Sequence, residues 1–269
     1  MYREHWGLRE APFRTSLDPR SFYQTPNAEE ALARLHFLVE ERRRVGLCFG
    51  PAGGGKSMLI EVLARQLRRR GRQVANIGLL SADVHELLWL LAAELGGNPA
   101  RSDSEFGLWR NVSERLTVNR LQQLDTVILL DDADEAEPPV ADAIARLADS
   151  DHSADARLTI VATATTGNVR RLGNRLVDLV DLRIDLEPWD QADTVGYILA
   201  ALRQAGRREP AFTDDAMIHL HELCDGIPRR ICQLANLSLL AGAGQRAAQI
   251  DAETVESAFH ELAAVEVAV

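Results

Sequence analysis

Strand-like and helix-like stretches alternate along the first two thirds of the chain. Short runs without helical periodicity predict strands at residues 45–49, 73–78, 126–130, 158–164 and 179–186. Apolar residues recur at helical spacing at about 26–44, 58–70, 83–95, 104–121 and 138–149. The run Thr126–Leu130 lacks any charge and is typical of a strand buried on both faces. The alternation predicts an α/β fold in which a parallel sheet is sandwiched by helices.

Beyond Pro188 the pattern becomes wholly helical. Helices are expected at about 190–205, 213–224, 228–243 and 251–264. Thr213 and Asp251 are suited to cap two of them. We therefore expect two domains: an α/β domain with an N-terminal extension over residues 1–188, and a small all-helical subdomain over residues 189–269.

The composition is that of a globular chain with an acidic balance. Apolar residues make up 46% of the 269 residues, which is ample for a sizeable core. A formal net charge of −10 argues against a general nucleic-acid coat held by a basic surface. The three cysteines form no C-x-x-C pair, so neither a disulfide framework nor a zinc site is indicated. Without a signal-peptide pattern or a transmembrane run of about 20 apolar residues, the sequence predicts a cytoplasmic protein.

Two arginine runs, Arg42–Arg44 and Arg68–Arg70, have two interpretations. Each is expected to close a helix, where cations near the last carbonyl groups are stabilising. The alternative is a local contact with DNA. We favour the dipole interpretation.

Gly50–Ser57 fits G-x-x-x-x-G-K-[ST], the pattern of a phosphate-binding loop. The predicted nucleotide-binding residues are Gly50, Pro51, Ala52, Gly53, Gly54, Gly55, Lys56, Ser57 and Met58. Glycine lets backbone N–H groups approach phosphate oxygens closely. Lys56 would reach the β and γ phosphates, the Ser57 hydroxyl would hold Mg²⁺, and the following helix would direct its positive end at the phosphates. Because a strand precedes the loop and a helix follows it, we favour a nucleotide site over an ordinary glycine-rich turn.

Two carboxylates, Asp131 and Asp132, come directly after the buried run Thr126–Leu130. Open α/β sheets bind ligands at the carboxyl ends of their strands. We expect Asp131 to hold Mg²⁺, directly or through water, and Asp132 to orient and polarise an attacking water. The alternative is a solvated acidic turn.

Two further residues are candidates for contacts with phosphate. Thr165 follows a predicted strand and could sense the γ-phosphate, although threonine is also an ordinary residue at a strand end. Arg229 lies in the first turn of a predicted helix, where the helix dipole disfavours a cation. Arginine at that position indicates a nearby anion, so we favour a phosphate contact over a surface salt bridge.

Taken together, these features resemble the AAA+ ATPases. Six segments narrow the resemblance to the ATPase domain of general secretion pathway protein A, to which they are similar in the same order. Three of them precede the loop, HWGLREAPF, DPRSFYQTP and EEALARL, and three follow it, LEPW, GIPRRI and IDAETVESAF. The resemblance covers essentially the whole chain.

The resemblance implies a nucleotide domain followed by a helical lid, hydrolysis of ATP with Mg²⁺, and assembly into a ring or another homo-oligomer. By residue, it implies Lys56 and Ser57 as the loop pair, Asp131 as the metal carboxylate, Thr165 as the polar sensor and Arg229 as the lid arginine. It also implies that Tyr23–Pro26 lies against the adenine.

The chain departs from this family's pattern at two places. Asp132 stands where relatives usually have Glu. Its side chain is one methylene shorter, which withdraws the carboxylate by about 1.5 Å and predicts slow hydrolysis. Leu179 stands where an arginine is expected, which leaves Arg170, Arg171 and Arg175 as arginine-finger candidates for a neighbouring subunit's site.

We therefore expect a cytoplasmic AAA+ ATPase that hydrolyses ATP slowly to drive or switch a protein assembly with an unidentified protein partner. One alternative is a nucleotide-gated binding module with little turnover. Another is a DNA-transposition helper ATPase, although the acidic balance makes DNA a less favoured partner.

Overall fold

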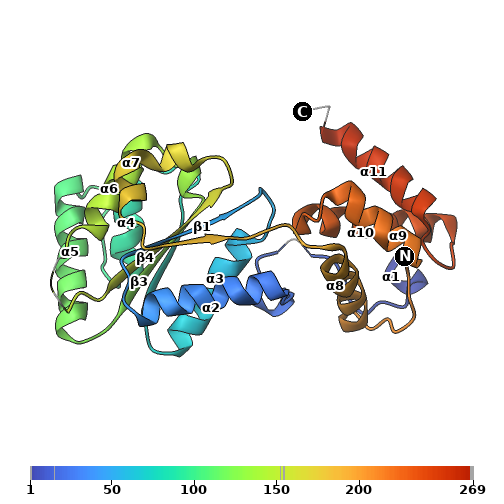
Figure 1. The fold of residues 1–269 in the computed structure, drawn as a ribbon, viewed down its shortest axis with the longest axis horizontal. Coiled ribbons are helices and arrows are strands. Elements are labelled where there is room, and N and C mark those ends of the chain that lie inside the picture. Colours follow the sequence, from blue (N-terminus) through green and yellow to red (C-terminus); the bar gives the residue numbers. More distant parts are fainter. Residues whose placement is uncertain (1, 15, 152, 154, 267–269) are drawn as a thin grey trace. The chain divides into compact units, whose positions relative to one another are not determined.

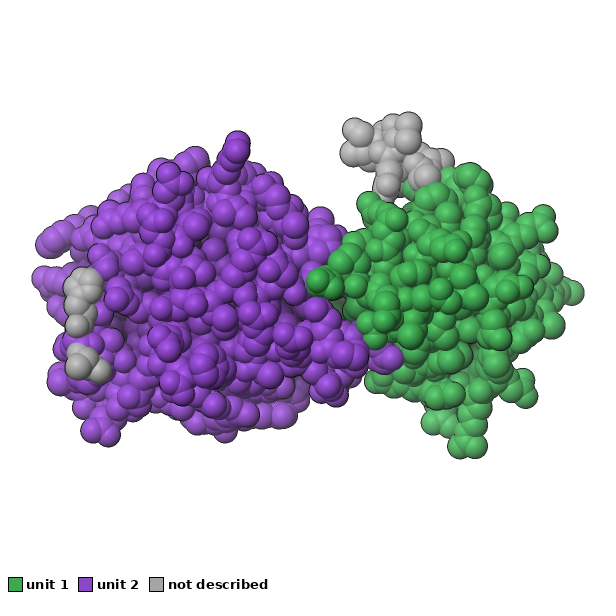
Figure 2. All heavy atoms as spheres, in the orientation of Figure 1, with its two compact units in different colours: residues 1–17, 53–55, 187–269 green, residues 18–52, 56–186 purple. Residues whose placement is uncertain are grey.

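The computed structural model describes residues 2–14, 16–151, 153 and 155–266, which form two compact units (Figure 1, Figure 2). The first, the sheet unit, comprises Asp18–Ala52 and Lys56–Leu186. The second, the helical unit, comprises Met1–Leu17, Gly53–Gly55 and Glu187–Val269.

A parallel sheet forms the centre of the sheet unit, and its five described strands run in the order β2-β3-β4-β1-β5. The strands are β1 (Val45–Gly50), β2 (Gln73–Gly78), β3 (Thr126–Asp131), β4 (Leu158–Thr165) and β5 (Leu182–Asp185). β4 lies between β1 and β3, with Gly50 opposite Thr165 and Leu130 opposite Ala162. Because the strands are parallel and in this register, the carboxyl ends of β1, β3 and β4 meet at one edge.

Helices cover both faces of this sheet, as Figure 1 shows. One face is covered by α2 (Pro26–Glu40) and α3 (Lys56–Arg69), and the other by α4 (Val84–Glu94), α5 (Glu105–Leu121), α6 (Pro138–Ala148) and α7 (Gly173–Asp178). Short 3₁₀ turns lie at η1 (Pro19–Ser21), η2 (Ala133–Glu135) and η3 (Val169–Leu172). Side chains alternate along each strand, so Ile128 packs on the α4 side and Val127 on the α2 side. The predicted α/β sandwich is confirmed.

The two arginine runs differ in structure, and the prediction for the first run is wrong. Arg68 and Arg69 lie in the last turn of α3, where they complement the dipole as expected. In contrast, α2 ends at Glu40, and Arg42 turns the chain with a positive φ of 51°. The run Arg42–Arg44 therefore lies beyond the helix, and the Arg42 guanidinium pairs with the buried carboxylate of Asp125 at 3.3 Å. This ion pair, rather than a helix dipole, accounts for Arg42.

In the helical unit, all the helices expected after Pro188 are present. They are α8 (Gln191–Gln204), α9 (Asp214–Cys224), α10 (Pro228–Gln245) and α11 (Ala252–Glu266), joined by the short N-terminal helix α1 (Tyr2–His5). Thr213 caps α9 as predicted, because its side chain accepts the Ala216 N–H at 3.2 Å. None of the helices in the described residues combines the length and the apolar character that crossing a bilayer requires.

The N-terminal segment groups with these helices rather than with the α/β domain, which differs from the predicted division at residue 188. Trp6 is 1% exposed, and its indole N–H donates to the Leu239 carbonyl of α10 at 2.8 Å. The backbone N–H of Arg9 donates to the Ala205 carbonyl at 2.8 Å. The N-terminal segment thus packs against the helices of the helical unit.

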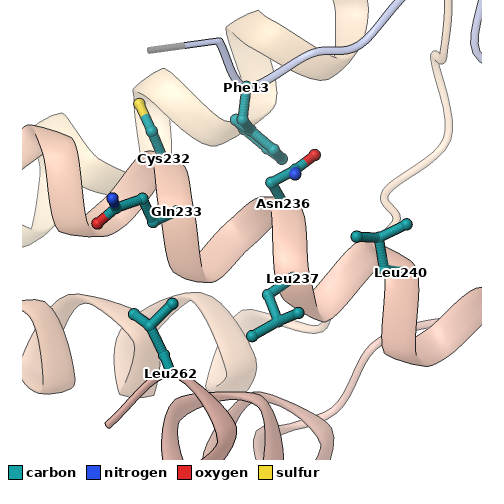
Figure 3. Close-up of a pocket in the computed structure, with 7 residues that line it drawn as sticks. All are labelled: Phe13, Cys232, Gln233, Asn236, Leu237, Leu240 and Leu262. Carbon is teal, nitrogen blue, oxygen red and sulfur yellow. The ribbon is translucent and has the colours of Figure 1, made fainter. Parts of the chain in front are cut away.

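A cavity of about 340 Å³ lies beside α10 in the helical unit (Figure 3). Its lining residues are Phe13, Cys232, Gln233, Asn236, Leu237, Leu240 and Leu262. Five of them follow one face of α10 at helical spacing, and Phe13 extends from the N-terminal segment toward that face. The N-terminal segment therefore contributes one wall of this cavity.

Candidate nucleotide site

The predicted phosphate-binding loop connects β1, which ends at Gly50, to α3, which begins at Lys56. Gly53 and Gly55 have φ angles of 76° and 98°, a region that favours glycine. A Cβ atom at Gly50 would lie 3.0 Å from the backbone carbonyl oxygen of Leu186. The loop therefore needs glycine at these three positions, for its backbone angles at two and for close packing at the third.

Lys56 is the only lysine among the 30 basic residues of the sequence. It is 5% exposed, and its ammonium group donates to the carbonyl oxygens of Gly50 at 3.0 Å and Pro51 at 3.1 Å. A buried ammonium needs such acceptors to offset its loss of hydration. The Lys56 side chain thus lies against the loop, next to the position where phosphate groups are predicted to bind.

Cys48 precedes the loop in β1 and packs as an apolar side chain. It is fully buried in the cluster between the sheet and the α2–α3 layer. Burial raises the pKa of its thiol to about 12, and the nearby charge of Lys56 opposes this rise only in part. The thiol is therefore protonated at neutral pH and is not a nucleophile of this site.

Both predicted aspartates at the end of β3 are bonded to Thr163 of β4, Asp131 through its carboxylate and Asp132 through its backbone N–H. The Thr163 hydroxyl donates to the Asp131 carboxylate at 2.5 Å and accepts the Asp132 backbone N–H at 2.9 Å. Asp132 adopts φ 53° and ψ 45°, a left-handed conformation that is uncommon for residues other than glycine. The chain therefore turns sharply at Asp132 while its N–H remains bonded to the neighbouring strand.

Asp134 forms a second connection between the β3 end and the β4 tip. Its side chain is fully buried, and its Oδ2 accepts the Thr165 backbone N–H at 3.1 Å and the Asn168 side-chain N–H at 2.8 Å. No hydrogen-bond partner for its Oδ1 is found among the described residues. The Thr166 N–H donates to the Gly50 carbonyl at 3.1 Å, so the β4 tip is also joined to the start of the loop.

The structure thus brings the loop, Asp131, Asp132 and Thr165 to one edge of the sheet. Sequence reasoning missed Thr163 and Asp134, which hold this edge together. A signal was present in both cases: Thr163 is a polar residue inside an apolar strand, and Asp134 is a further acid directly after the predicted pair.

The arginine candidates lie at separate places. Arg229 is in the first turn of α10, which contains no acidic residue and receives no side-chain cap from Ile227, its N-cap residue. Arg170, Arg171 and Arg175 are exposed on η3 and α7, and Arg171 pairs with Glu135 at 3.3 Å. Their predicted roles toward phosphate or a neighbouring subunit remain predictions.

The oxygen donors at this edge suit Mg²⁺. They are the Asp131 carboxylate and the Ser57 hydroxyl, which lies in the first turn of α3. Among the described residues, no group of three or more His, Cys, Asp or Glu is arranged to hold a metal ion alone. Mg²⁺ in proteins usually takes one or two protein ligands, and substrate phosphates and water complete its coordination.

Residues 39–172 match the family model described as the AAA domain. The chain carries an AAA domain. The matched segment takes in the loop from Gly50, the pair Asp131–Asp132 and all of β4. General secretion pathway protein A of Aeromonas hydrophila is 26% identical over 274 residues, which cover 98% of this chain and 49% of that protein. The chain therefore spans about half the length of the curated relative it matches.

Solved structures show the same fold for the AAA domain and the helices that follow it. Cdc6p from Pyrobaculum aerophilum gives a TM-score of 0.71 at 17% identity, over 89% of this chain and 67% of that one. Drosophila ORC bound to DNA gives a TM-score of 0.72 at 17% identity, over 94% of this chain and 64% of that one. Identities this low establish the AAA+ fold alone.

Proposed function

We propose that this chain binds ATP with Mg²⁺ at Gly50–Met58 and hydrolyses it slowly to drive or switch a protein assembly. One observation carries the proposal: the loop, the carboxylates Asp131 and Asp132 and the tip of β4 share one edge of the sheet. Phosphoryl transfer requires positioning and charge neutralisation more than covalent chemistry, and such an edge supplies both.

The roles follow from the chemistry of each side chain. Lys56 exchanges its loop carbonyls for phosphate oxygens, and the loop N–H groups bind the same anion. Ser57 and Asp131 hold Mg²⁺, which would neutralise charge on the transferring phosphate. Asp132 orients the attacking water, Thr165 contacts the γ-phosphate, and Arg229 supplies a further positive charge.

The assembly is proposed to contain several copies of this chain and an unidentified protein partner. The relative named general secretion pathway protein A supports a role in secretion, which we include in the proposal. The acidic balance of the chain supports a protein partner over a nucleic acid.

The experiment that tests the proposal couples size measurement to phosphate release. In light scattering on the full chain, ATP with Mg²⁺ is expected to increase the mass above that of the monomer, while phosphate appears slowly. ADP with Mg²⁺ serves as the control and is expected to release no phosphate. A chain that neither binds ATP nor releases phosphate would contradict the proposal.

The position of Asp132 favours a second candidate, a nucleotide-gated binding module with little turnover. Its side chain is shorter than Glu, and it starts from a left-handed backbone. In this case ATP would bind and change the surface offered to a partner, while few molecules would be hydrolysed. Substitution at this position distinguishes the two functions.

Asp132→Glu is expected to raise turnover by roughly 10-fold, because the added methylene returns the carboxylate toward the water. The left-handed backbone tolerates Asp better than Glu, so a lower Tm is expected as well. Turnover per bound ATP and the Tm are measured on the same preparation.

Asp132→Asn is the matched control, because it keeps the size and the backbone preference but removes the charge. It is expected to bind ATP normally and to lose turnover. Equal turnover in the wild type and in the Glu and Asn variants would support the module and contradict a catalytic Asp132.

A further inference from the structure

The hydroxyl of Thr163 lies between the carboxylate of Asp131, the predicted metal ligand, and the backbone nitrogen of Asp132, the predicted catalytic residue. It is fully buried within β4, 2.5 Å from Asp131 Oδ1 and 2.9 Å from the Asp132 nitrogen. A backbone N–H can only donate, so the hydroxyl must accept from Asp132. Its single proton is then directed to Asp131. The orientation of the hydroxyl is therefore fixed from both sides.

This geometry divides the two oxygens of Asp131 between two tasks. Oδ1 receives the Thr163 proton, which fixes the rotation of the carboxylate. No other hydrogen bond to this carboxylate is found in the part of the chain that the structure describes, so Oδ2 remains for a cation or for one of the waters around it. A carboxylate held in this way binds a cation through one oxygen, which suits the strict octahedral geometry of Mg²⁺.

The same hydroxyl also secures the turn at Asp132. The regular β3–β4 pairing ends with Leu130 opposite Ala162. Beyond that pair, Thr163 accepts through its side chain the N–H of Asp132, which is two residues after Leu130 and has φ 53°. A left-handed residue persists only where its surroundings hold it, and this bond is one such restraint. The direction of the Asp132 side chain thus depends on Thr163.

Asp134 strengthens the connection in the opposite direction, from β3 to β4. Its buried carboxylate accepts the Thr165 backbone N–H and the Asn168 amide. The β3 end and the β4 tip therefore hold each other at two points. Movement of one is expected to move the other.

We propose that Thr163 is a positioning residue of the nucleotide site, which orients Asp131 toward the cation and Asp132 toward the water. This inference rests on the proposed binding of ATP with Mg²⁺. Thr163 is buried and bonded to the two aspartates, so we expect it to act through them, on steps that depend on Mg²⁺ and on the attacking water.

Thr163→Val tests the proposal, because valine has the shape of threonine without its hydroxyl. Nucleotide affinity without Mg²⁺ is expected to stay within about 3-fold of the wild type, because the loop and Lys56 are unchanged. The increase in nucleotide affinity on adding Mg²⁺ should shrink by roughly 10-fold, and turnover should fall by roughly 10- to 100-fold with little change in KM. Thr163→Ser keeps the hydroxyl, so its turnover and the effect of Mg²⁺ on its nucleotide affinity are expected to stay within about 3-fold of the wild type.

Thr159→Val is the matched control on the same strand. Thr159 is also buried, and its hydroxyl donates to the Arg43 carbonyl at 2.9 Å, at the opposite end of β4. Both valine variants lose a buried hydrogen bond and are expected to lower the Tm, but Thr159→Val should leave Mg²⁺ dependence and turnover unchanged. Equal effects of the two valine variants on Mg²⁺ dependence would overturn the positioning role.

Further outcomes separate this inference from the function on which it rests. If the wild type binds ATP with Mg²⁺ and Thr163→Val retains the full Mg²⁺ dependence, the inference fails and the proposed function stands. If Thr163→Val does not fold, Thr163→Ser tests the inference instead. This variant keeps the hydroxyl, so loss of its Mg²⁺ dependence would overturn the role of the hydroxyl. A wild type without Mg²⁺-dependent nucleotide binding would overturn both.

Discussion

Replacing Lys56 with alanine is expected to lower ATP affinity by at least about 100-fold. The ammonium group is predicted to bond to two phosphate groups, and charge-assisted hydrogen bonds contribute about 1.5–3 kcal/mol each. No other lysine exists in the chain to replace it. Titration calorimetry with a non-hydrolysable ATP analogue measures the affinity directly.

The folded state should survive this substitution. The Gly50 carbonyl, one of the two acceptors of the Lys56 ammonium, also accepts the Thr166 N–H at 3.1 Å and so keeps a partner. Arg69→Ala is the matched control, because Arg69 is an exposed cation at the far end of the same helix, α3. If Lys56→Ala has an unchanged affinity for ATP and a normal Tm, the assignment of the nucleotide site to Gly50–Met58 is wrong.

Trp6→Ala is expected to destabilise the helical unit by about 3–5 kcal/mol, the usual cost of truncating a buried aromatic side chain. The indole ring is 1% exposed, donates to the Leu239 carbonyl at 2.8 Å, and lies 5.1 Å beneath the Arg207 guanidinium. The substitution would leave a cavity and remove the hydrogen bond from the indole to the Leu239 carbonyl. Urea unfolding of the full chain, followed by circular dichroism, is the measurement.

Two companion variants separate packing from hydrogen bonding at Trp6. Trp6→Phe keeps most of the buried ring but loses the donor to Leu239, so a cost of about 1–2 kcal/mol is expected. Gly242→Ala would place a Cβ 2.9 Å from the Trp6 ring, which should destabilise the wild type but cost less when Trp6 is alanine. Additive effects of Trp6→Ala and Gly242→Ala would contradict this close packing.

The regular elements of the fold could be predicted because their signals are local. The strand Thr126–Asp131 and its buried core follow from a run without charge, and the loop at Gly50 follows from its spacing of glycine, lysine and serine. The helices after Pro188 follow from periodicity and from caps such as Thr213. In each case, the residues that decide the structure are neighbours in the sequence.

The interactions that organise the candidate site could not be predicted in the same way. Thr163 reaches Asp131 only because β4 lies next to β3 in this register, and periodicity specifies neither strand order nor register. The left-handed turn at Asp132 and the pairing of Arg42 with Asp125 likewise depend on residues distant in sequence. For the same reason, the N-terminal segment could be recognised as packed but not assigned to a partner.

A lone buried lysine also makes this chain unusually simple to label. Apart from the N-terminal amine, Lys56 carries the only primary amine in the sequence, and it is enclosed beneath the loop by the carbonyls of Gly50 and Pro51. An amine-reactive reagent would therefore modify one internal side chain, at a rate set by how often the loop exposes it. Acylation of lysine in a cell would likewise have a single internal acceptor, and the modified chain would lose the charge under its glycine-rich loop.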